Sequence, residues 1–136
     1  MIDQCSTLKN TYQFNFERLI VMFSLRSLFG SNPQYDNIKK VDVATFKKGL
    51  KHKNSQLVDV RTPGEYQQGH IKKAILINIF SRDFKEKVQQ LDPEKPVYLY
   101  CRSGGRSARA SKILAKMGFK DIYDLKGGYL AWKSHG

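Results

Sequence analysis

The segment from Val97 to Leu114 most strongly constrains the fold of this 136-residue chain. It begins with four apolar and aromatic residues, Val97-Tyr98-Leu99-Tyr100, which is typical of a strand buried inside a parallel sheet. A short loop with two glycines follows, and residues 107–114 have the pattern of a helix. Strand, tight loop and helix in this order predict an α/β fold.

The loop after this strand consists of Cys101, Arg102, Ser103, Gly104, Gly105 and Arg106. Its glycines let the backbone amides turn inward, and the following helix directs unpaired N–H groups at the same point. These amides and the guanidinium groups of Arg102 and Arg106 lower the pKa of a thiol and bind anions. We therefore expect Cys101 to be a thiolate nucleophile that needs no general base and shares its pocket with an anionic substrate. The alternative is a strand-end cysteine that only packs.

Two further motifs accompany this loop. Residues 57–66 read LVDVRTPGEY and lead to Gly69-His70-Ile71, and residues 125–132 read LKGGYLAW. With the loop 101–106, these motifs span about Val41 to Lys133. The order and spacing of these motifs resemble those of a single-domain rhodanese, a thiosulfate sulfurtransferase-like protein.

The resemblance implies a three-layer α/β fold, in which a central parallel sheet of about five strands has helices on both faces. It also implies a cysteine that alternates between thiol and persulfide, with no cofactor and no metal ion. The chain departs from the family where Lys73 replaces a small residue and where Phe80 replaces a frequent proline. We expect Phe80 and Arg82 near the rim of the substrate entrance, and neither departure touches the expected chemistry.

Polar residues of the first motif are candidates for supporting roles. Asp59 and Arg61 lie at the carboxyl end of a predicted strand, where open α/β sheets place their sites, and Arg61 could orient substrate. We expect Asp59 and Glu65 to accept hydrogen bonds from Arg61 or from loop amides and so to fix the loop geometry. His70 is a candidate acid or base, but the resemblance implies a packed, hydrogen-bonded residue instead.

The length of the loop separates two chemistries. In the phosphatases and arsenate reductases that share this fold, the corresponding loop consists of a cysteine, five residues and an arginine. Here four residues stand between Cys101 and Arg106, and Ser107 occupies the place of the arginine in the longer loop. The loop also contains no Asp to serve as a general acid for a leaving alkoxide. The smaller loop therefore favours a sulfane sulfur over a phosphate.

The predicted function is that of a sulfurtransferase. It moves a sulfane sulfur from thiosulfate or a related persulfide to a thiophilic acceptor, such as a thiol, through a Cys101 persulfide. The alternative is a partner-specific sulfur-relay module with the same loop, which turns over small donors poorly and passes its sulfur to one docked protein. A purely structural interaction domain is disfavoured because the loop is intact.

Hydrophobic patterning predicts the remaining elements. Strands are expected at Gln56–Val60, Ala74–Ile79 and Asp121–Leu125. Helices are expected after the caps Asp42 and Thr62, and around Phe84, Val88 and Leu91. Trp132 is expected on a final helix that packs on the sheet, and Gly127 and Gly128 before it are expected to allow a close backbone approach beneath the loop.

Length and cysteine content suit one domain in a reducing environment. A chain of 136 residues, 40% of them hydrophobic, buries one core. The domain is expected at 33–136, after a tail of residues 1–32. The apolar segment of this tail, Leu19–Phe23, is too short for a membrane span, and we hypothesise that translation begins at Met22. The two cysteines, Cys5 and Cys101, allow no disulfide framework, which favours the cytoplasm.

The net charge of +12 raises the question of partners. Six lysines cluster around one predicted helix, namely Lys39, Lys40, Lys47, Lys48, Lys51 and Lys53. Such a face could steer small anions or an acidic partner protein, although a solvated helix face is the simpler interpretation. Nucleic acid is not expected as a partner, because no aromatic residues are interleaved with these lysines except Phe46, which is expected in the core.

Overall fold

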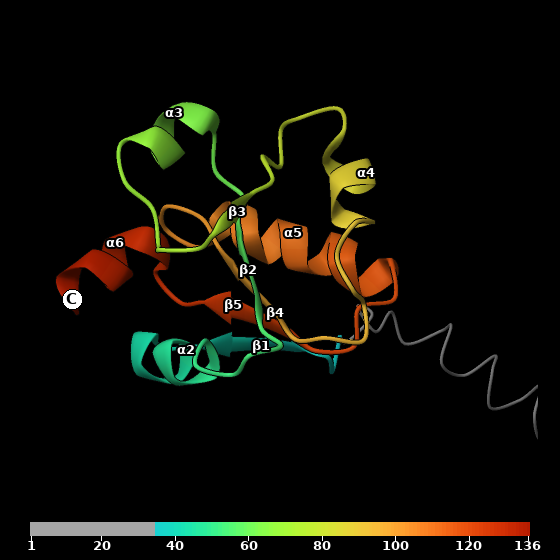
Figure 1. Ribbon diagram of the computed structural model, residues 1–136, viewed down its shortest axis with the longest axis horizontal. Coiled ribbons are helices and arrows are strands. Elements are labelled where there is room, and N and C mark those ends of the chain that lie inside the picture. The colour runs from blue at the N-terminus through green and yellow to red at the C-terminus, as the bar shows by residue number, and fades with distance from the viewer. Residues whose placement is uncertain (1–34) are drawn as a thin grey trace, which may run out of the picture. The chain divides into compact units, whose positions relative to one another are not determined.

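The computed structural model describes residues 35–136, in which five parallel strands form one sheet between helices (Figure 1). The strands are β1 (Ile38–Val41), β2 (Gln56–Asp59), β3 (Ile75–Leu76), β4 (Val97–Tyr100) and β5 (Ile122–Leu125). The helices are α2 (Val43–Gly49), α3 (Pro63–Gln67), α4 (Phe84–Val88), α5 (Gly105–Lys116) and α6 (Gly128–Ser134). The predicted α/β class with a five-stranded parallel sheet is confirmed.

The strand order β1-β5-β4-β2-β3 places β4 in the middle of the sheet. Its partners hold it in register on both sides, with Leu99 opposite Val58 of β2 and opposite Asp124 of β5. All four residues of β4 are buried, as the continuous apolar run predicted. Cys101 follows directly at the carboxyl end of this central strand.

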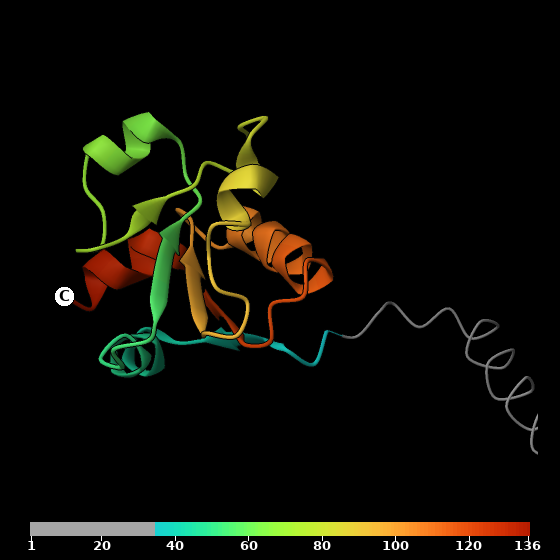
Figure 2. The same ribbon diagram turned by 45° about the vertical axis from the view of Figure 1, so that its right-hand side comes forward.

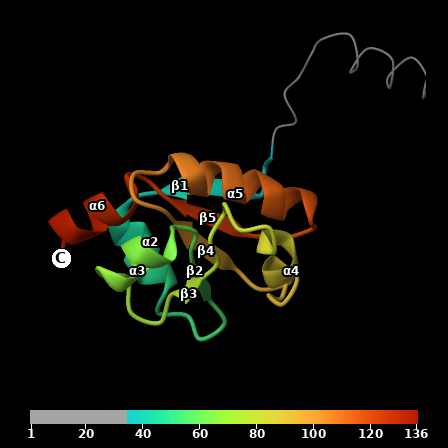
Figure 3. The same ribbon diagram turned by 90° about the horizontal axis from the view of Figure 1, so that it is seen from above.

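Side chains of β4 alternate between two cores, one on each face of the sheet. Tyr98 and Tyr100 belong to the core on the α2 and α6 side, which also contains Phe46. Leu99 and Cys101 belong to the core on the α4 and α5 side. Figures 2 and 3 show α5 and α2 on opposite sides of the sheet. The pleat of the strand therefore directs the Cys101 side chain toward α5.

Two short helices begin as the sequence predicted. The Asp42 carboxylate accepts a hydrogen bond of 2.8 Å from Thr45 N and caps α2. At α3, Thr62 and Glu65 form a reciprocal capping box, with a proline at the first helical turn. Trp132 lies on α6 as predicted, where its ring meets the ring of Phe46 edge-on at 6.3 Å.

Three elements differ from the sequence-based expectation. β1 was not predicted as a strand, because two of its four residues are exposed lysines and its apolar content is low. β3 has two residues instead of the six from Ala74 to Ile79, although Ile77 N and Ile79 N still donate to Asp59 O and to Val60 O. The helix around Phe84 ends at Val88, and Leu91 packs from the turn that follows.

The predicted tail, its segment Leu19–Phe23 and the start at Met22 lie outside the described residues. Within residues 35–136, none of the helices has the length and apolar character needed to cross a membrane. The same residues contain no cluster of three or more His, Cys, Asp or Glu side chains placed to hold a metal ion.

Candidate active site

The Cys101 side chain lies at the floor of the loop between β4 and α5. The residue is 1% exposed, and its Sγ accepts a hydrogen bond of 3.0 Å from Gly104 N. Gly104 has a φ of 113°, in the left-handed region that favours glycine, and this conformation turns its amide toward the sulfur. α5 begins at the next residue. The predicted cradle of inward amides is therefore present at the thiol.

Opposing effects act on the pKa of Cys101. Burial raises the pKa of the thiol, but hydrogen bonds from the Ser107 hydroxyl and from the amides of Ser107, Gly104 and Ser103 outweigh burial. The net pKa lies below its ordinary value. The loop amides that were expected to have this effect therefore contribute to it, together with the Ser107 hydroxyl on the first turn of α5.

The guanidinium of Arg106 does not face the thiol as a free group, which corrects the sequence-based expectation. Its Nη1 and Nη2 donate to Glu65 Oε2 and Oε1, both at 2.7 Å. Glu65 was expected to accept from Arg61 or from loop amides, and instead it joins the loop to the capping box of α3. This hydrogen bond with Arg106 is the main reason why the pKa of Glu65 falls to about 2.

A second ion pair lies deeper, below the loop. The Asp59 carboxylate accepts from Arg61 N at 2.9 Å and from the Nε and Nη2 of Arg61 at 2.7–3.0 Å. Arg61 Nη2 also donates to Gly69 O at 2.7 Å, and the guanidinium lies 4.4 Å from the ring centre of Tyr129. Asp59 therefore accepts hydrogen bonds from Arg61, as the sequence predicted.

α6 holds the loop from beneath. Tyr129 N donates to Cys101 O at 2.8 Å, and Leu130 N donates to Arg102 O at 3.1 Å. A side chain on Gly128, whose φ is 59°, would approach Cys101 O and Arg102 O to within 2.6 Å. The close backbone approach expected of the two glycines is confirmed at Gly128.

The other predicted residues lie at the surface of the site. Arg102, Ser103 and Gly105 are exposed on the loop. Phe80 is 64% exposed, and the Arg106 guanidinium lies 5.9 Å from its ring centre, so Phe80 lies beside the loop, but neither Phe80 nor Arg82 is among the residues that line the pocket described below. His70 is exposed, stacks on a tyrosine ring at 3.7 Å and bonds to a carbonyl through Nδ1, which agrees with the hydrogen-bonded role expected for it.

Two buried polar residues near the thiol were not predicted. The Ser107 hydroxyl, on the first turn of α5, donates to Gly104 O at 3.2 Å and also lowers the pKa of Cys101. Asp124 of β5 is 2% exposed, and its Oδ1 has no hydrogen-bond partner within residues 35–136. Burial raises the pKa of Asp124, and the Ser107 hydroxyl opposes this rise. A polar residue inside an otherwise apolar strand was the signal that could have identified Asp124.

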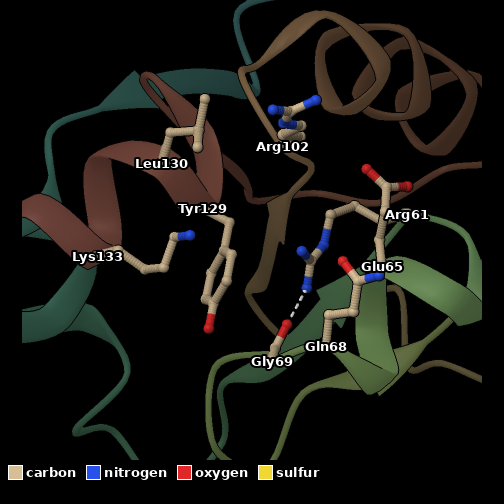
Figure 4. Close-up of a pocket in the computed structure, with 8 residues that line it drawn as sticks. All are labelled: Arg61, Glu65, Gln68, Gly69, Arg102, Tyr129, Leu130 and Lys133. Carbon is tan, nitrogen blue, oxygen red and sulfur yellow. Dashed lines mark hydrogen bonds between the residues drawn. The ribbon is translucent and has the colours of Figure 1, made fainter.

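A pocket of about 300 Å³ opens next to the loop (Figure 4). On one side its wall comes from α3 and the turn after it, through Glu65, Gln68 and Gly69. Arg61 lies at the base of this wall, where the dashed line in Figure 4 marks its bond to Gly69 O. The α3 side therefore offers polar groups, most of them already hydrogen-bonded.

The opposite wall of the pocket comes from α6 and from the loop. α6 contributes Tyr129, Leu130 and Lys133, and the loop contributes Arg102 (Figure 4). Leu130 is 45% exposed, and Lys133 Nζ lies 5.3 Å from the ring centre of Tyr129. This side of the pocket combines two cations with aromatic and aliphatic surface.

Comparisons with known proteins give one family model and several relatives. The model of the Rhodanese-like domain matches residues 42–135. The uncharacterized protein YqhL of Bacillus subtilis is 43% identical over 81 residues, which is 60% of this chain and 63% of YqhL. Thiosulfate sulfurtransferase 18 of Arabidopsis thaliana is 32% identical over 117 residues, covering 77% of this chain and 85% of the relative. A tRNA uridine(34) hydroxylase of Cytophaga hutchinsonii is 32% identical over 124 residues, but this chain spans only 40% of its length.

Solved structures lead to the same fold. A rhodanese-related protein from Thermoplasma volcanium matches with a TM-score of 0.64 and 31% sequence identity. The match covers 72% of this chain and 93% of that protein. The rhodanese-like architecture expected from the sequence is confirmed.

Proposed function

Because the chain belongs to the rhodanese-like domain family, we propose that it is a sulfurtransferase that carries a sulfane sulfur as a persulfide on Cys101. The observation that carries this proposal is the hydrogen bond of 3.0 Å from Gly104 N to Cys101 Sγ, in a loop that leads into α5. An amide directed at sulfur stabilises a thiolate and a persulfide alike, since both are anions. The relative named as a thiosulfate sulfurtransferase supports the same class of reaction.

In the first half-reaction, the Cys101 thiolate attacks the outer sulfur of thiosulfate or of a related persulfide. A new S–S bond forms at Cys101, the S–S bond of the donor breaks, and sulfite or the donor thiolate leaves with the electron pair. Exposed Arg102 and the loop amides, including that of Ser103, bind this anionic leaving group. Because the loop lowers the pKa of the thiol, a larger fraction of Cys101 is thiolate than in a free cysteine, and the proposed reaction includes no general base.

In the second half-reaction, a thiophilic acceptor attacks the outer sulfur of the Cys101 persulfide. The acceptor gains the sulfur, the bond to Cys101 Sγ breaks, and the thiolate is regenerated. Because one product leaves before the acceptor reacts, the kinetics are ping-pong.

The remaining predicted site residues are positioning residues in this proposal. Gly104 adopts the positive φ that the turn of the loop needs, and Gly105 is the first residue of α5. Arg106 and Glu65 tie the loop to α3, while Asp59 holds Arg61 in place below it. None of these four side chains needs to touch the reacting sulfur.

The test is intact-protein mass spectrometry before and after a brief incubation with thiosulfate, followed by cyanide. A mass gain of one sulfur atom that cyanide removes is expected in the parent protein and in Cys5→Ser, and neither the gain nor turnover is expected in Cys101→Ser. The Cys5→Ser variant is the matched control, because the chain has two cysteines. Sulfur loading or turnover that persists without Cys101 would refute the assignment.

The sulfur-relay alternative has the same loop and differs in its donor. A Cys101 that reacts with a small alkylating reagent but gains no sulfur from thiosulfate would favour the relay. The search would then turn to protein and low-molecular-weight persulfides as donors. The lysine face around α2 is where an acidic protein partner would dock in that case.

A further inference from the structure

Tyr129, Leu130 and Lys133, which line the pocket between the loop and α6, have no role in the reaction described so far. Its volume of about 300 Å³ lies at the lower end of the range for small-molecule sites. It adjoins the loop, because Tyr129 N and Leu130 N bond to the carbonyls of Cys101 and Arg102, and Arg102 also lines the pocket. A ligand in this pocket therefore lies beside the loop that carries the sulfur.

The charges that line the pocket favour an anion. Arg102 and Lys133 form no ion pair within residues 35–136. The single carboxylate of the lining, Glu65, is already held by two hydrogen bonds of 2.7 Å from Arg106. Two cations without a partner carboxylate therefore face the pocket, and a negatively charged group on a ligand would be attracted to them.

The apolar part of the wall indicates that the ligand has a carbon skeleton. The Tyr129 ring lies between two cations, with the Arg61 guanidinium 4.4 Å and Lys133 Nζ 5.3 Å from its centre. Leu130 exposes 45% of its surface next to it. Thiosulfate has no carbon atoms to bury against this surface, and it is too small to fill the pocket.

We propose that this pocket binds the sulfur acceptor and selects a small thiol that carries a carboxylate, with Lys133 and Arg102 as the groups that recognise the negative charge. The inference rests on the proposed function, since it names the acceptor for the same persulfide. The acceptor thiol loses its proton to solvent, and its thiolate attacks the outer sulfur of the persulfide. The S–S bond to Cys101 breaks, the Cys101 thiolate leaves with the electron pair, and the acceptor departs as a persulfide anion.

The kinetic test compares two thiols of similar size, 3-mercaptopropionate, which is anionic, and 2-mercaptoethanol, which is neutral. Lys133→Met is expected to raise the ratio of their KM values, anionic over neutral, about fivefold, because a charged contact is lost. The matched control is Lys112→Met, which removes an exposed lysine of α5 outside the pocket lining and is expected to leave the ratio unchanged. A ratio that Lys133→Met does not change, or that both variants change equally, would overturn the proposal.

A binding measurement separates this inference from the proposed function. In the Cys101→Ser protein, which cannot turn over, 3-mercaptopropionate is expected to shift the amide NMR signals of residues 129–133, and 2-mercaptoethanol is not. Equal shifts with both thiols, or none, would overturn the acceptor site even if the parent protein transfers sulfur to cyanide. Carboxylate-dependent shifts, combined with a parent protein that gains no sulfur from thiosulfate or from persulfide donors, would support the anion-binding pocket and refute the sulfurtransferase.

Discussion

Two arginine–carboxylate pairs flank the loop that contains Cys101, and they differ in burial and in what they connect. The inner pair, Arg61 with Asp59, has side chains that are 4% and 0% exposed and lies within one short segment of chain. The outer pair, Arg106 with Glu65, is 24% and 27% exposed and joins residues 41 positions apart. The inner pair is part of the core, whereas the outer pair is a tether between the loop and α3.

The difference matters because the same interaction has different energetics in the two places. A buried ion pair loses its hydration, so removal of one partner leaves an uncompensated charge in the core. A partly exposed pair keeps part of its hydration, so removal of one partner costs less. Integrity of the fold should therefore depend on Asp59, and the fixing of the loop should depend on Glu65.

The largest expected effect comes from breaking the inner pair. Asp59→Asn is expected to lower the free energy of unfolding by about 3–5 kcal/mol, because Arg61 is then buried without its counter-charge. Urea unfolding followed by the fluorescence of Trp132, the single tryptophan of the chain, measures this loss.

Two variants check this interpretation. Glu94→Gln removes a carboxylate of an exposed pair with Lys120 and is expected to cause no measurable change. The double variant Asp59→Asn with Arg61→Met is expected to regain part of the lost stability, because it leaves no isolated charge. A double variant that is no more stable than Asp59→Asn would show that packing, and not the unpaired charge, causes the loss.

Breaking the outer pair is expected to cost less. Glu65→Gln leaves Arg106 without its counter-charge at the surface of the site, where water reaches it, while a glutamine at this position can still accept the capping-box hydrogen bond from Thr62 N. We expect a loss of about 2 kcal/mol at neutral pH in the same urea experiment, from the charged hydrogen bonds to Arg106. If Glu65→Gln lowered the free energy of unfolding as much as Asp59→Asn, the outer pair would be as important to the fold as the inner pair, which would contradict this comparison.

The outer pair also predicts how stability depends on acid. The pKa of Glu65 falls from an ordinary 4.5 to about 2 in the folded protein, mainly through the hydrogen bond with Arg106. A carboxylate with a lowered folded pKa contributes stability above its unfolded pKa, and this contribution is lost as the pH falls from about 4.5 to about 2. The parent should therefore lose more stability than Glu65→Gln over this range, as measured by urea unfolding at a series of pH values. Parallel curves for the two proteins would contradict the assignment.

Asp124 provides a contrast to both pairs, because its carboxyl group is buried without an arginine partner among the described residues. Burial raises its folded pKa above 3.8, so the folded protein holds a proton that the unfolded chain releases, and stability falls as the pH rises from about 4. Asp124→Asn removes this penalty and is expected to raise stability at neutral pH by about 1 kcal/mol. Thermal unfolding at pH 4 and pH 7 tests this, and a variant that is less stable at pH 7 would contradict it.

Much of this fold was predictable from local patterns. The four apolar residues of β4, rich in β-branched and aromatic side chains, are typical of a strand buried between two others, and the caps Asp42 and Thr62 mark the starts of α2 and α3 because each satisfies free amides next to it in sequence. β1 was missed because its partner, β5, lies more than 80 residues away and local sequence contains no sign of the pairing. The length of β3 was overestimated for a related reason, since an apolar run does not show where the ladder with β2 ends.

The candidate site shows the same division. The loop around Cys101 and the role of Gly104 follow from a strand, two glycines and a helix in sequence. The partner of Arg106 could not be chosen, because Glu65 reaches it only through the packing of α3 against the loop. The Ser107 hydroxyl was missed because a serine on the first turn of a helix has no pattern that distinguishes a solvent-facing side chain from a buried one.

The depth of Cys101 makes the site selective for the shape of a reagent. Because the residue is 1% exposed below a loop with an amide on its sulfur, only an atom at the tip of a slim molecule can reach the sulfur without displacing the loop. A sulfur in the middle of a branched or ring-bearing molecule would collide with the loop backbone first. For the sulfurtransferase proposed above, we therefore expect donors with a terminal sulfur atom to react and donors with only internal sulfur atoms to be excluded on steric grounds.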